Sequence, residues 1–180
     1  MSGFDSNAGA ALPDLLAPGL DLVLCGCNPG LYSAAVGHYF AHPGNAFWRL
    51  LAEASITPRF FHPEEDQLLP ALGIGLTDVV ARSSAGIDAV RPEEWQAGAR
   101  ALAQRLLRYR PAAVCFVGAA GYRAFAGRRH TRWGRQPEDW EGIAVFVVPS
   151  PSGRAARLGE TRRVAFAEVG TWLRERRARS

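Results

Sequence analysis

The chain has 180 residues, of which 48% are apolar, and its formal net charge is +4. All 21 basic residues are arginine, which excludes a lysine nucleophile, a Schiff-base lysine and the lysine of a nucleotide triphosphatase phosphate loop. No stretch is apolar for long enough to span a bilayer, so we expect no membrane partner. We predict one domain over residues 14–180, preceded by a disordered arm over residues 1–13 that lacks the features of a secretion signal.

The cysteine content and the charge distribution indicate the cellular compartment and the kind of partner to expect. Three cysteines cannot form a disulfide framework, which predicts a cytoplasmic protein. Residues 151–180 hold eight arginines against three glutamates. A basic segment of this kind indicates either contact with a polyanion or a solvated helix face.

Strands and helices are predicted to alternate along the chain. In chain order, the pattern predicts a buried strand over residues 20–25, a loop over 26–44, a helix from Asn45 to about Ser55, a helix from Pro63 to Gly73 and a strand over 74–80. There follow a turn-rich loop over 81–91, a helix from Pro92 to Tyr109, a strand over 112–117, a short helix after Gly118, a polar loop over 128–139, a strand over 143–148 and a last helix from about Glu160. This alternation predicts an α/β fold, a single-domain three-layer αβα sandwich with a mainly parallel central sheet.

Two loops with unusual composition follow predicted strands. The sequence CGCNPG occupies residues 25–30 at the end of the first strand, and PSPSGRAAR occupies residues 149–157 after the last. Ligands of such sheets bind at the carboxyl ends of the strands. We therefore expect the functional site between these two loops.

The first loop is open to several chemistries, including a metal site and a phosphate loop. Cys25 and Cys27 are closer in sequence than zinc ligands usually are, and His38 and His42 follow without a clear helix, so we predict packed cysteines and no metal. The segment lacks a G-x-G-x-x-G pattern, and Pro29 removes a backbone donor that a phosphate would need. A dinucleotide site is therefore not expected.

Asn28 offers another interpretation, a carboxamide aimed at a substrate. Its side chain has two donors and one acceptor, and the following Pro29-Gly30 turn holds it at the end of a strand. Such a group suits the orientation of a water molecule or pairing with the edge of a heterocycle. Asparagine before Pro-Gly is also common in plain turns, so Asn28 alone does not decide between the alternatives.

The surrounding sequence, CGCNPGLYSAAVGHYFAHPGNAFWRLL, resembles the mismatch-specific uracil-DNA glycosylase and thymine-DNA glycosylase family. The first motif of that family, G-x-N-P-G, matches Gly26–Gly30, and its F-A-H-P-x-N-x-F-W segment matches Phe40–Trp48. The similarity extends over residues 14–175 and includes Val148–Gly153. It implies the uracil-DNA glycosylase fold.

The resemblance also implies roles for individual residues. Asn28 would orient the hydrolytic water near the sugar C1′, and Phe40 would stack on the flipped base. Backbone groups around Cys27 and Gly30 would read the base edge, in a pocket that includes Ser150. The following loop would enter the duplex with Arg154 as its wedge, and the implied DNA contacts are Ser152, Gly153, Arg154, Ala155 and Arg157.

The last loop departs from the bacterial branch of the family. That branch has N-P-S-G-L-S, whereas the chain has S-P-S-G-R-A, which is more similar to the thymine-processing branch. Arg154, Arg157, Arg162 and Arg163 are candidates for phosphate contacts. His42 suits either a phosphate contact or a structural role.

This interpretation does not identify the side chain that would act as general base and activate the water molecule. A carboxamide cannot deprotonate water, so the site is either a modest catalyst or uses a carboxylate. We predict Asp88 for this role because it lies in a turn-rich loop that can reach the site. Asp78, which is embedded in apolar sequence, is the alternative, and both carboxylates also suit surface or capping roles.

The predicted function is that of a monofunctional DNA glycosylase without lyase activity. The resemblance implies excision of uracil, and also of thymine or bulky damaged pyrimidines, from double-stranded DNA with G·U or G·T mispairs. It further implies a monomeric, cytoplasmic repair enzyme of the bacterial nucleoid that needs no cofactor. The alternatives are a non-catalytic mismatch-binding module and an iron–sulfur glycosylase, for which three cysteines are too few.

Overall fold

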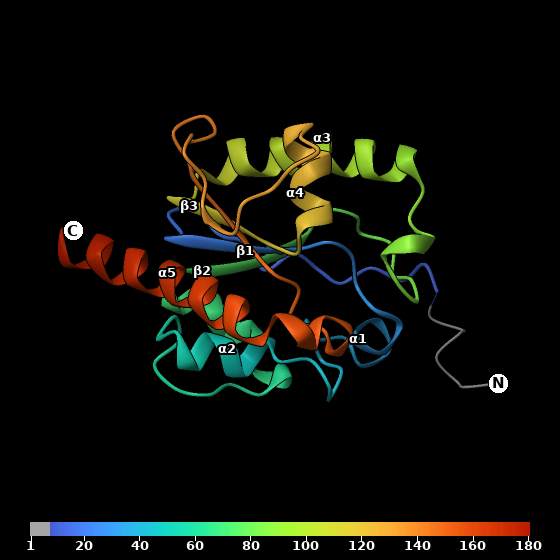
Figure 1. Ribbon diagram of the computed structural model, residues 1–180, viewed down its shortest axis with the longest axis horizontal. Coiled ribbons are helices and arrows are strands. Elements are labelled where there is room, and N and C mark those ends of the chain that lie inside the picture. The colour runs from blue at the N-terminus through green and yellow to red at the C-terminus, as the bar shows by residue number, and fades with distance from the viewer. Residues whose placement is uncertain (1–7) are drawn as a thin grey trace.

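The computed structural model describes residues 8–180 and contains a five-stranded central sheet (Figure 1). The strand order is β2-β1-β3-β5-β4, and only the short edge strand β4 is antiparallel to its neighbour. The strands are β1 (Leu22–Gly26), β2 (Ile74–Asp78), β3 (Ala113–Val117), β4 (Gly134–Arg135) and β5 (Ala144–Val148). The four parallel strands consist almost wholly of buried residues, as expected for a sheet covered on both faces.

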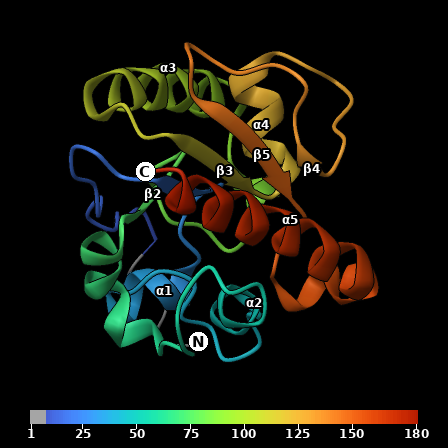
Figure 2. The same cartoon turned by 90° about the vertical axis from the view of Figure 1, so that its left-hand side faces the viewer.

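Helices cover both faces of this sheet, which confirms the predicted three-layer α/β sandwich (Figure 2). The helical segments are α1 (Leu31–Val36), α2 (Phe47–Glu53), α3 (Pro92–Tyr109), α4 (Ala119–Ala126) and α5 (Gly159–Ala178), with 3₁₀ segments η2 (Pro63–Leu72), η3 (Ile87–Ala89) and η4 (Gly153–Leu158). Helices α3 and α4 lie on one face, and α2 and α5 lie on the other.

Alternation along the strands divides the core into two clusters. In β3, Cys115 packs toward the α2 and α5 side, whereas Val114 and Phe116 pack toward α3 and α4. The larger cluster receives Phe47 and Phe166 from its helices, and both of these side chains are essentially inaccessible to solvent. Each fully buried side chain of this size contributes about 1.5–3 kcal/mol relative to its exposed state. The centre of the sheet is therefore the best-packed part of the core.

The structure corrects the predicted elements at three places. The predicted loop over residues 26–44 contains α1, a six-residue helix that ends at Gly37 in the left-handed conformation. The predicted helix over 63–73 is the 3₁₀ segment η2, which contains Pro70 and ends at Gly73 with φ of 76°. The predicted polar loop over 128–139 contains β4. Short elements of this kind carry too few apolar repeats to be recognised by periodicity.

The predicted N-terminal arm is only partly within the described residues. Residues 1–7 lie outside them. The next residues pack on the domain: Gly9 N donates to Ser83 O at 3.3 Å, Ser83 N donates to Ala10 O at 3.0 Å, and Leu12 is 9% exposed. Disorder is thus the wrong prediction for residues 8–13, because backbone pairing and the burial of Leu12 hold this segment. No described helix is long and apolar enough to cross a membrane.

Candidate active site

The loops of interest leave the sheet from one edge. In the strand register, Gly26 is aligned with Asp78 on one side and with Val117 on the other, and Val117 is aligned with Val148. The parallel strands β2, β1, β3 and β5 therefore end side by side. The segments that follow β1, β2 and β5 can meet at this edge, as the sequence pattern predicted.

Backbone hydrogen bonds join the loop after β1 to the loop after β2. Val79 N donates to Gly26 O at 2.9 Å, Val80 N donates to Cys27 O at 2.9 Å, and Ser84 N donates to Pro29 O at 3.1 Å. These bonds continue the sheet pairing beyond the ends of the strands. They hold Asn28, which lies between them, at a fixed position relative to residues 79–84.

The carboxamide of Asn28 has a defined orientation. Its Nδ2 atom donates to Arg82 O at 3.0 Å and to Ser84 Oγ at 2.7 Å, and the Ser84 hydroxyl in turn donates to Gly86 O at 2.8 Å. A backbone carbonyl can only accept, so the Arg82 contact fixes which end of the amide is nitrogen. Within residues 8–180, no group donates to Asn28 Oδ1, which leaves this oxygen as an acceptor for a water molecule.

Phe40 presents an aromatic ring near this loop. One face of the ring is stacked on Phe47, with ring centroids 3.9 Å apart and an interplanar angle of 22°. Phe47 is fully buried, whereas Phe40 is only partly buried. Phe47 covers one face of the Phe40 ring, so the other face is the one on which a planar ligand could stack.

Asp78 lies at the edge of the Phe40 ring, over the backbone of Gly26. A side chain added at Gly26 would overlap Asp78 Oδ1 and would approach Phe40 Cζ to 3.2 Å. Glycine is required here because the carboxyl group and the ring together occupy the space of a Cβ atom. Asp78 is 6% exposed, and in the described part of the chain no group hydrogen-bonds its carboxyl oxygens.

Burial alters the ionisation of Asp78. Desolvation, and after it the negative charge of Asp14, raise the pKa of Asp78, the positive charge of Arg105 lowers it, and the net pKa is about 8. Arg105 does not neutralise the Asp78 carboxyl because its Nη1 atom donates to Asp14 and Thr77, while its Nη2 atom donates to the Asp78 backbone carbonyl. The carboxyl group of Asp78 is therefore mainly protonated at pH 7.

Asp88 occupies a different environment. It lies in η3 with an exposed side chain. Among the described residues, no hydrogen bond or ion pair connects its carboxylate to Asn28 or to Phe40. Its position does not support the prediction that Asp88 activates water, although the loop that carries it does reach the site through Ser84 and Gly86.

The loop after β5 is anchored from α5. The Nη1 atom of Arg162 donates to Ser150 O at 3.2 Å and to Ser152 O at 3.4 Å. Arg162 is 7% exposed, so the prediction of a phosphate contact for this residue is wrong: its charge is used inside the protein. Pro151 O accepts from Ala46 N at 2.9 Å, which ties the same loop to the segment before α2.

The predicted wedge residue, Arg154, lies against the loop that follows β2. Arg154 is exposed, and its Nη1 atom would be 2.9 Å from a Cβ atom at Gly86, so the guanidinium lies against the loop that carries Ser84. Gly153 is exposed, and a Cβ atom added to it would lie 3.6 Å from the carbonyl oxygen of Gly44. Ala155 interrupts the helical turn with φ of −101° and ψ of 19°. The predicted wedge loop, the residue 44 loop and the residue 86 loop thus converge.

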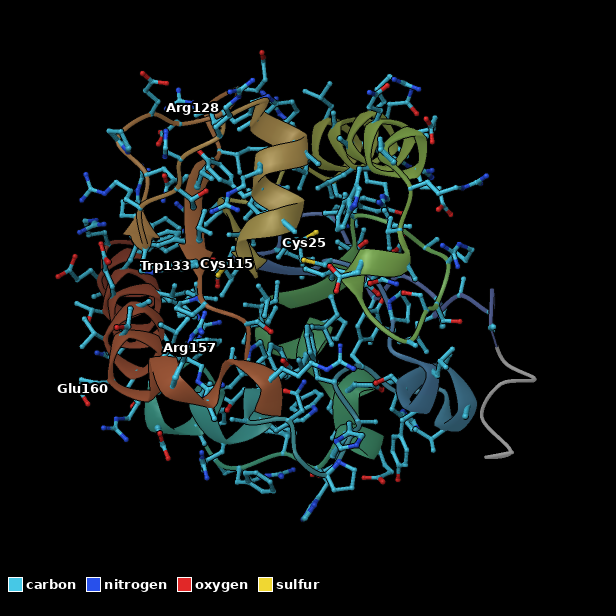
Figure 3. All side chains as sticks on the ribbon, turned by 45° about the vertical axis from the view of Figure 1, so that its right-hand side comes forward. Cys25, Cys115, Arg128, Trp133, Arg157 and Glu160 are labelled. Carbon is cyan, nitrogen blue, oxygen red and sulfur yellow. The ribbon has the colours of Figure 1, made fainter. Side chains whose placement is uncertain are left out.

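The arginines after the wedge differ in their availability. Arg157 is exposed on the segment that leads into α5 (Figure 3). Arg163 is exposed as well, but it forms an ion pair with Glu160. Arg154 and Arg157 are therefore the freer of the predicted phosphate-binding residues.

The cysteines of the first loop are packed, un-ionised thiols. Burial raises the pKa of Cys27 to about 11 and that of Cys25 well above its ordinary value. Cys27 Sγ lies 3.9 Å from Val117 O and packs against Gly118, away from the carboxamide of Asn28. Within residues 8–180, no three His, Cys, Asp or Glu side chains are grouped as a metal site would require.

The remaining predicted residues have simpler surroundings. Gly30 is exposed and precedes α1, and the Cys27 carbonyl is already paired with Val80. Exposed His42 accepts from Gly44 N at 3.0 Å and contacts the Tyr32 ring edge-on. His42 thus has local partners that suit a structural role.

Sequence reasoning missed Ser84 and ranked Asp78 below Asp88. Ser84 has no recognisable motif, since its role depends on pairing with Asn28 across 56 residues. A signal for Asp78 was present: it ends an apolar strand that neighbours β1, so its side chain must lie beside the first loop.

Two surface crevices lie elsewhere, on the α3 and α4 layer. They have volumes of 360 and 220 Å³, share Phe125 and Trp140, and contain none of the predicted site residues. The site described above is a convergence of loops at the strand ends, and neither crevice enters it.

Comparison with known proteins identifies a family and a similar fold. The family model described as the uracil DNA glycosylase superfamily matches residues 13–174. The fold is also similar to the solution NMR structure of "a putative Uracil DNA glycosylase from Methanosarcina acetivorans". That match has a TM-score of 0.64 and 23% sequence identity, and it covers 92% of this chain and 98% of the other.

Proposed function

Because the chain belongs to the uracil DNA glycosylase superfamily, we propose that it is a monofunctional DNA glycosylase that hydrolyses the N-glycosidic bond of uracil opposite guanine. The observation that carries the proposal is the carboxamide of Asn28, which Arg82 and Ser84 hold with its oxygen free. The partly exposed ring of Phe40 lies against Gly26, two residues before Asn28. Hydrolysis needs an oriented acceptor that can hold a water molecule, whereas a protein that only binds mismatches could use this amide only to pair with a base edge.

The proposed reaction begins with extrusion of the nucleotide. A base in a duplex cannot be attacked at its glycosidic carbon, and flipping costs about a few kcal/mol, with the least cost for a mispair. Stacking of the flipped base on Phe40 offsets this cost by about 1–3 kcal/mol. Arg154 enters the space left in the duplex, where its donors can meet the unpaired guanine. Thymine and bulky damaged pyrimidines opposite guanine are further proposed substrates.

Hydrolysis then follows at C1′ of the flipped nucleotide. Asn28 Oδ1 accepts a hydrogen bond from one water molecule and so directs the water oxygen toward C1′. The C1′–O bond forms as the C1′–N bond breaks, the base leaves with the bonding electron pair, and a proton of the water passes to the base. The amide cannot remove a full proton, so its contribution is orientation and partial charge. A free base and an intact abasic strand are the products.

We assign Asp78 to recognition of the base. Its neutral carboxyl group carries one donor and one acceptor side by side, and uracil carries the complementary pair, a ring N–H next to a carbonyl oxygen. The carboxyl lies at the edge of the ring on which the base would stack, which supports this role over that of Asp88. An ionised Asp78 would have no donor for the uracil carbonyl.

Replacing Asp78 with asparagine tests this assignment through the pH dependence of cleavage. Asparagine keeps a donor and an acceptor but cannot ionise, so we expect Asp78→Asn to stay within about tenfold of the wild-type rate at pH 7. The wild-type rate should fall as the pH rises through about 8, and the variant should lack this fall. Single-turnover rates between pH 6 and 9 measure both effects, with Asp88→Asn as the control that keeps the wild-type profile. A loss of about 10²-fold or more in Asp78→Asn, together with loss of an acidic limb, would instead make Asp78 the general base.

The same substitution has an expected effect on stability. Folding raises the pKa of Asp78, so the protonated group favours the folded state, and this contribution is complete below about pH 4 and is lost as the pH rises through about 8. The melting temperature of Asp78→Asn should therefore increase relative to that of the wild type between pH 4 and pH 8. Thermal melts across this range measure the difference. An unchanged difference would mean that Asp78 is not protonated in the folded protein.

We expect Arg154 to affect the rate of cleavage of duplex DNA and not the hydrolysis step itself. As a wedge it stabilises the extruded state, which single-stranded DNA reaches without help. Arg154→Ala should lower the ratio of the duplex rate to the single-strand rate by about tenfold. Arg157→Ala is the matched control, expected to weaken binding of both substrates and to reduce the salt slope by about 1. Equal losses on both substrates for Arg154→Ala would make it a simple phosphate contact.

A cleavage assay on one set of oligonucleotides tests the proposed function itself. The set contains G·U, A·U and G·T duplexes, a bulky damaged cytosine opposite guanine, and single-stranded uracil. We expect the fastest release from G·U, and strand breaks only after alkali, because the chain has no lysine to form a Schiff base. Tight G·U binding without base release would favour the non-catalytic mismatch-binding alternative.

A further inference from the structure

Phe40 has an unusual backbone conformation for an aromatic residue. Its φ angle is 50°, in the left-handed region that glycine prefers. A glycine at this position would remove the strain, but it would also remove the ring that stacks on Phe47. Strained residues of this kind persist only where their surroundings hold them in place. The groups that hold Phe40 are therefore part of its role.

Three side chains hold the backbone on both sides of Phe40. Asp66 Oδ2 accepts from Tyr39 N at 3.1 Å, and Trp48 Nε1 donates to Tyr39 O at 3.1 Å. On the other side, Ser33 Oγ accepts from Ala41 N at 3.0 Å. We refer to Ser33, Trp48 and Asp66 as the backbone clamp.

The clamp is built from three separate elements, and its members are buried. Ser33 comes from α1, Trp48 from α2 and Asp66 from η2, and they are 6%, 4% and 2% exposed. The second carboxylate oxygen of Asp66 accepts from His38 Nδ1 at 3.2 Å. Asp66 thus fixes two consecutive residues that lead into Phe40.

We infer that Asp66, with Ser33 and Trp48, is a positioning residue that sets the Phe40 ring as the platform for the flipped base. The inference rests on the proposed function, in which the base stacks on Phe40. Among the described residues, no member of the clamp hydrogen-bonds Asn28 or Asp78, and its bonds to Tyr39 and Ala41 flank Phe40, so we expect its effect on the reaction to pass through the placement of the ring. Misplacement of a bound group by about 1 Å can lower a rate by about 10²-fold.

A double-mutant cycle between Asp66 and Phe40 separates positioning from general stability. Asp66→Ala should lower the single-turnover cleavage of a G·U duplex by about tenfold or more, with little change in duplex affinity. In a Phe40→Ala background the same change should have little further effect, because no ring remains to be placed. Asp66→Asn keeps an oxygen for Tyr39 N and should restore most of the rate. Glu65→Ala is the matched control, since Glu65 lies in the same segment but binds Arg59 and His62.

The outcomes distinguish this inference from the proposed function. An equal loss from Asp66→Ala in both backgrounds would overturn the positioning role. If the wild-type protein cleaves none of the duplexes, the proposed function fails, and the clamp is judged by amide hydrogen exchange over residues 38–41. Exchange should then be faster in Asp66→Ala than in Asp66→Asn, and equal exchange would overturn the clamp. If Asp66→Ala does not fold, Ser33→Ala, which removes the hydroxyl that accepts from Ala41 N and little volume, takes its place in the same cycle.

Discussion

Asn28→Ala is expected to lower the single-turnover cleavage of a G·U duplex by about 10²-fold or more. The reason is that the variant loses the only group at the end of β1 whose acceptor is held in place by two hydrogen bonds and left free to orient water. Duplex affinity should change little, because Asn28 is only partly exposed and meets the reacting centre rather than the DNA backbone. Rapid-mixing cleavage and equilibrium binding measure the two quantities separately.

A graded variant and a control make this result specific. Ser84→Ala removes one acceptor of Asn28 Nδ2 and leaves Arg82 O and the longer contact to Pro29 O, so its loss should be smaller than that of Asn28→Ala. Gln67→Ala removes an exposed carboxamide in η2 and should leave the rate unchanged. A wild-type cleavage rate in Asn28→Ala would remove Asn28 from the mechanism.

Gly170→Ala is expected to give the largest loss of stability among single methyl additions in α5. A Cβ atom at Gly170 would overlap the carbonyl oxygen of Ala54 and would lie 3.0 Å from its carbon, where α2 ends against α5. The same carbonyl accepts from Arg174 Nη1 at 3.1 Å. Overpacking against backbone costs about 1–3 kcal/mol or more, which in a chain of this size lowers the melting temperature by about 2–4 °C per kcal/mol.

Gly159→Ala is the matched control for this prediction. It makes the same exchange at the first residue of the same helix, where no atom lies within 4 Å of the added carbon. Reduced freedom of the unfolded chain should stabilise this variant by about 0.4–1 kcal/mol. Thermal melts of both variants test the close contact between α2 and α5. Equal melting temperatures would mean that the two helices are not packed as described.

The layered fold could be predicted from the sequence because its four parallel strands are buried runs that alternate with helices. Asn28 could be found because its motif is contiguous in the chain. Ser84 and Asp66 could not be found, since each acts through hydrogen bonds to a segment far away in sequence. Arg162 shows a different limit: composition alone cannot tell a charge that faces DNA from one that anchors a loop.

The choice between Asp78 and Asp88 illustrates the same limit. Local composition favoured Asp88, because a turn-rich loop is the usual place for a reactive group. Strand order reverses the ranking, since β2 lies next to β1 and brings Asp78 over Gly26. Sequence gives the residues that are adjacent along the chain, whereas the register of the sheet decides which of them share the site.

The backbone pairing between the loops after β1 and β2 has a consequence for how such a site can diversify. Its bonds join main-chain atoms of Gly26, Cys27 and Pro29 to residues 79, 80 and 84, and no side chain takes part in them. These main-chain bonds do not require particular side chains at positions 28 and 78, although the Asn28 carboxamide adds bonds of its own to Arg82 and Ser84. A substitution at position 28 changes the group that orients water, and a substitution at position 78 changes recognition of the base. The main-chain pairing between the two loops is kept in both cases. New lesion preferences are thus accessible by single codon changes, whereas an inserted or deleted residue in either loop would shift both positions at once.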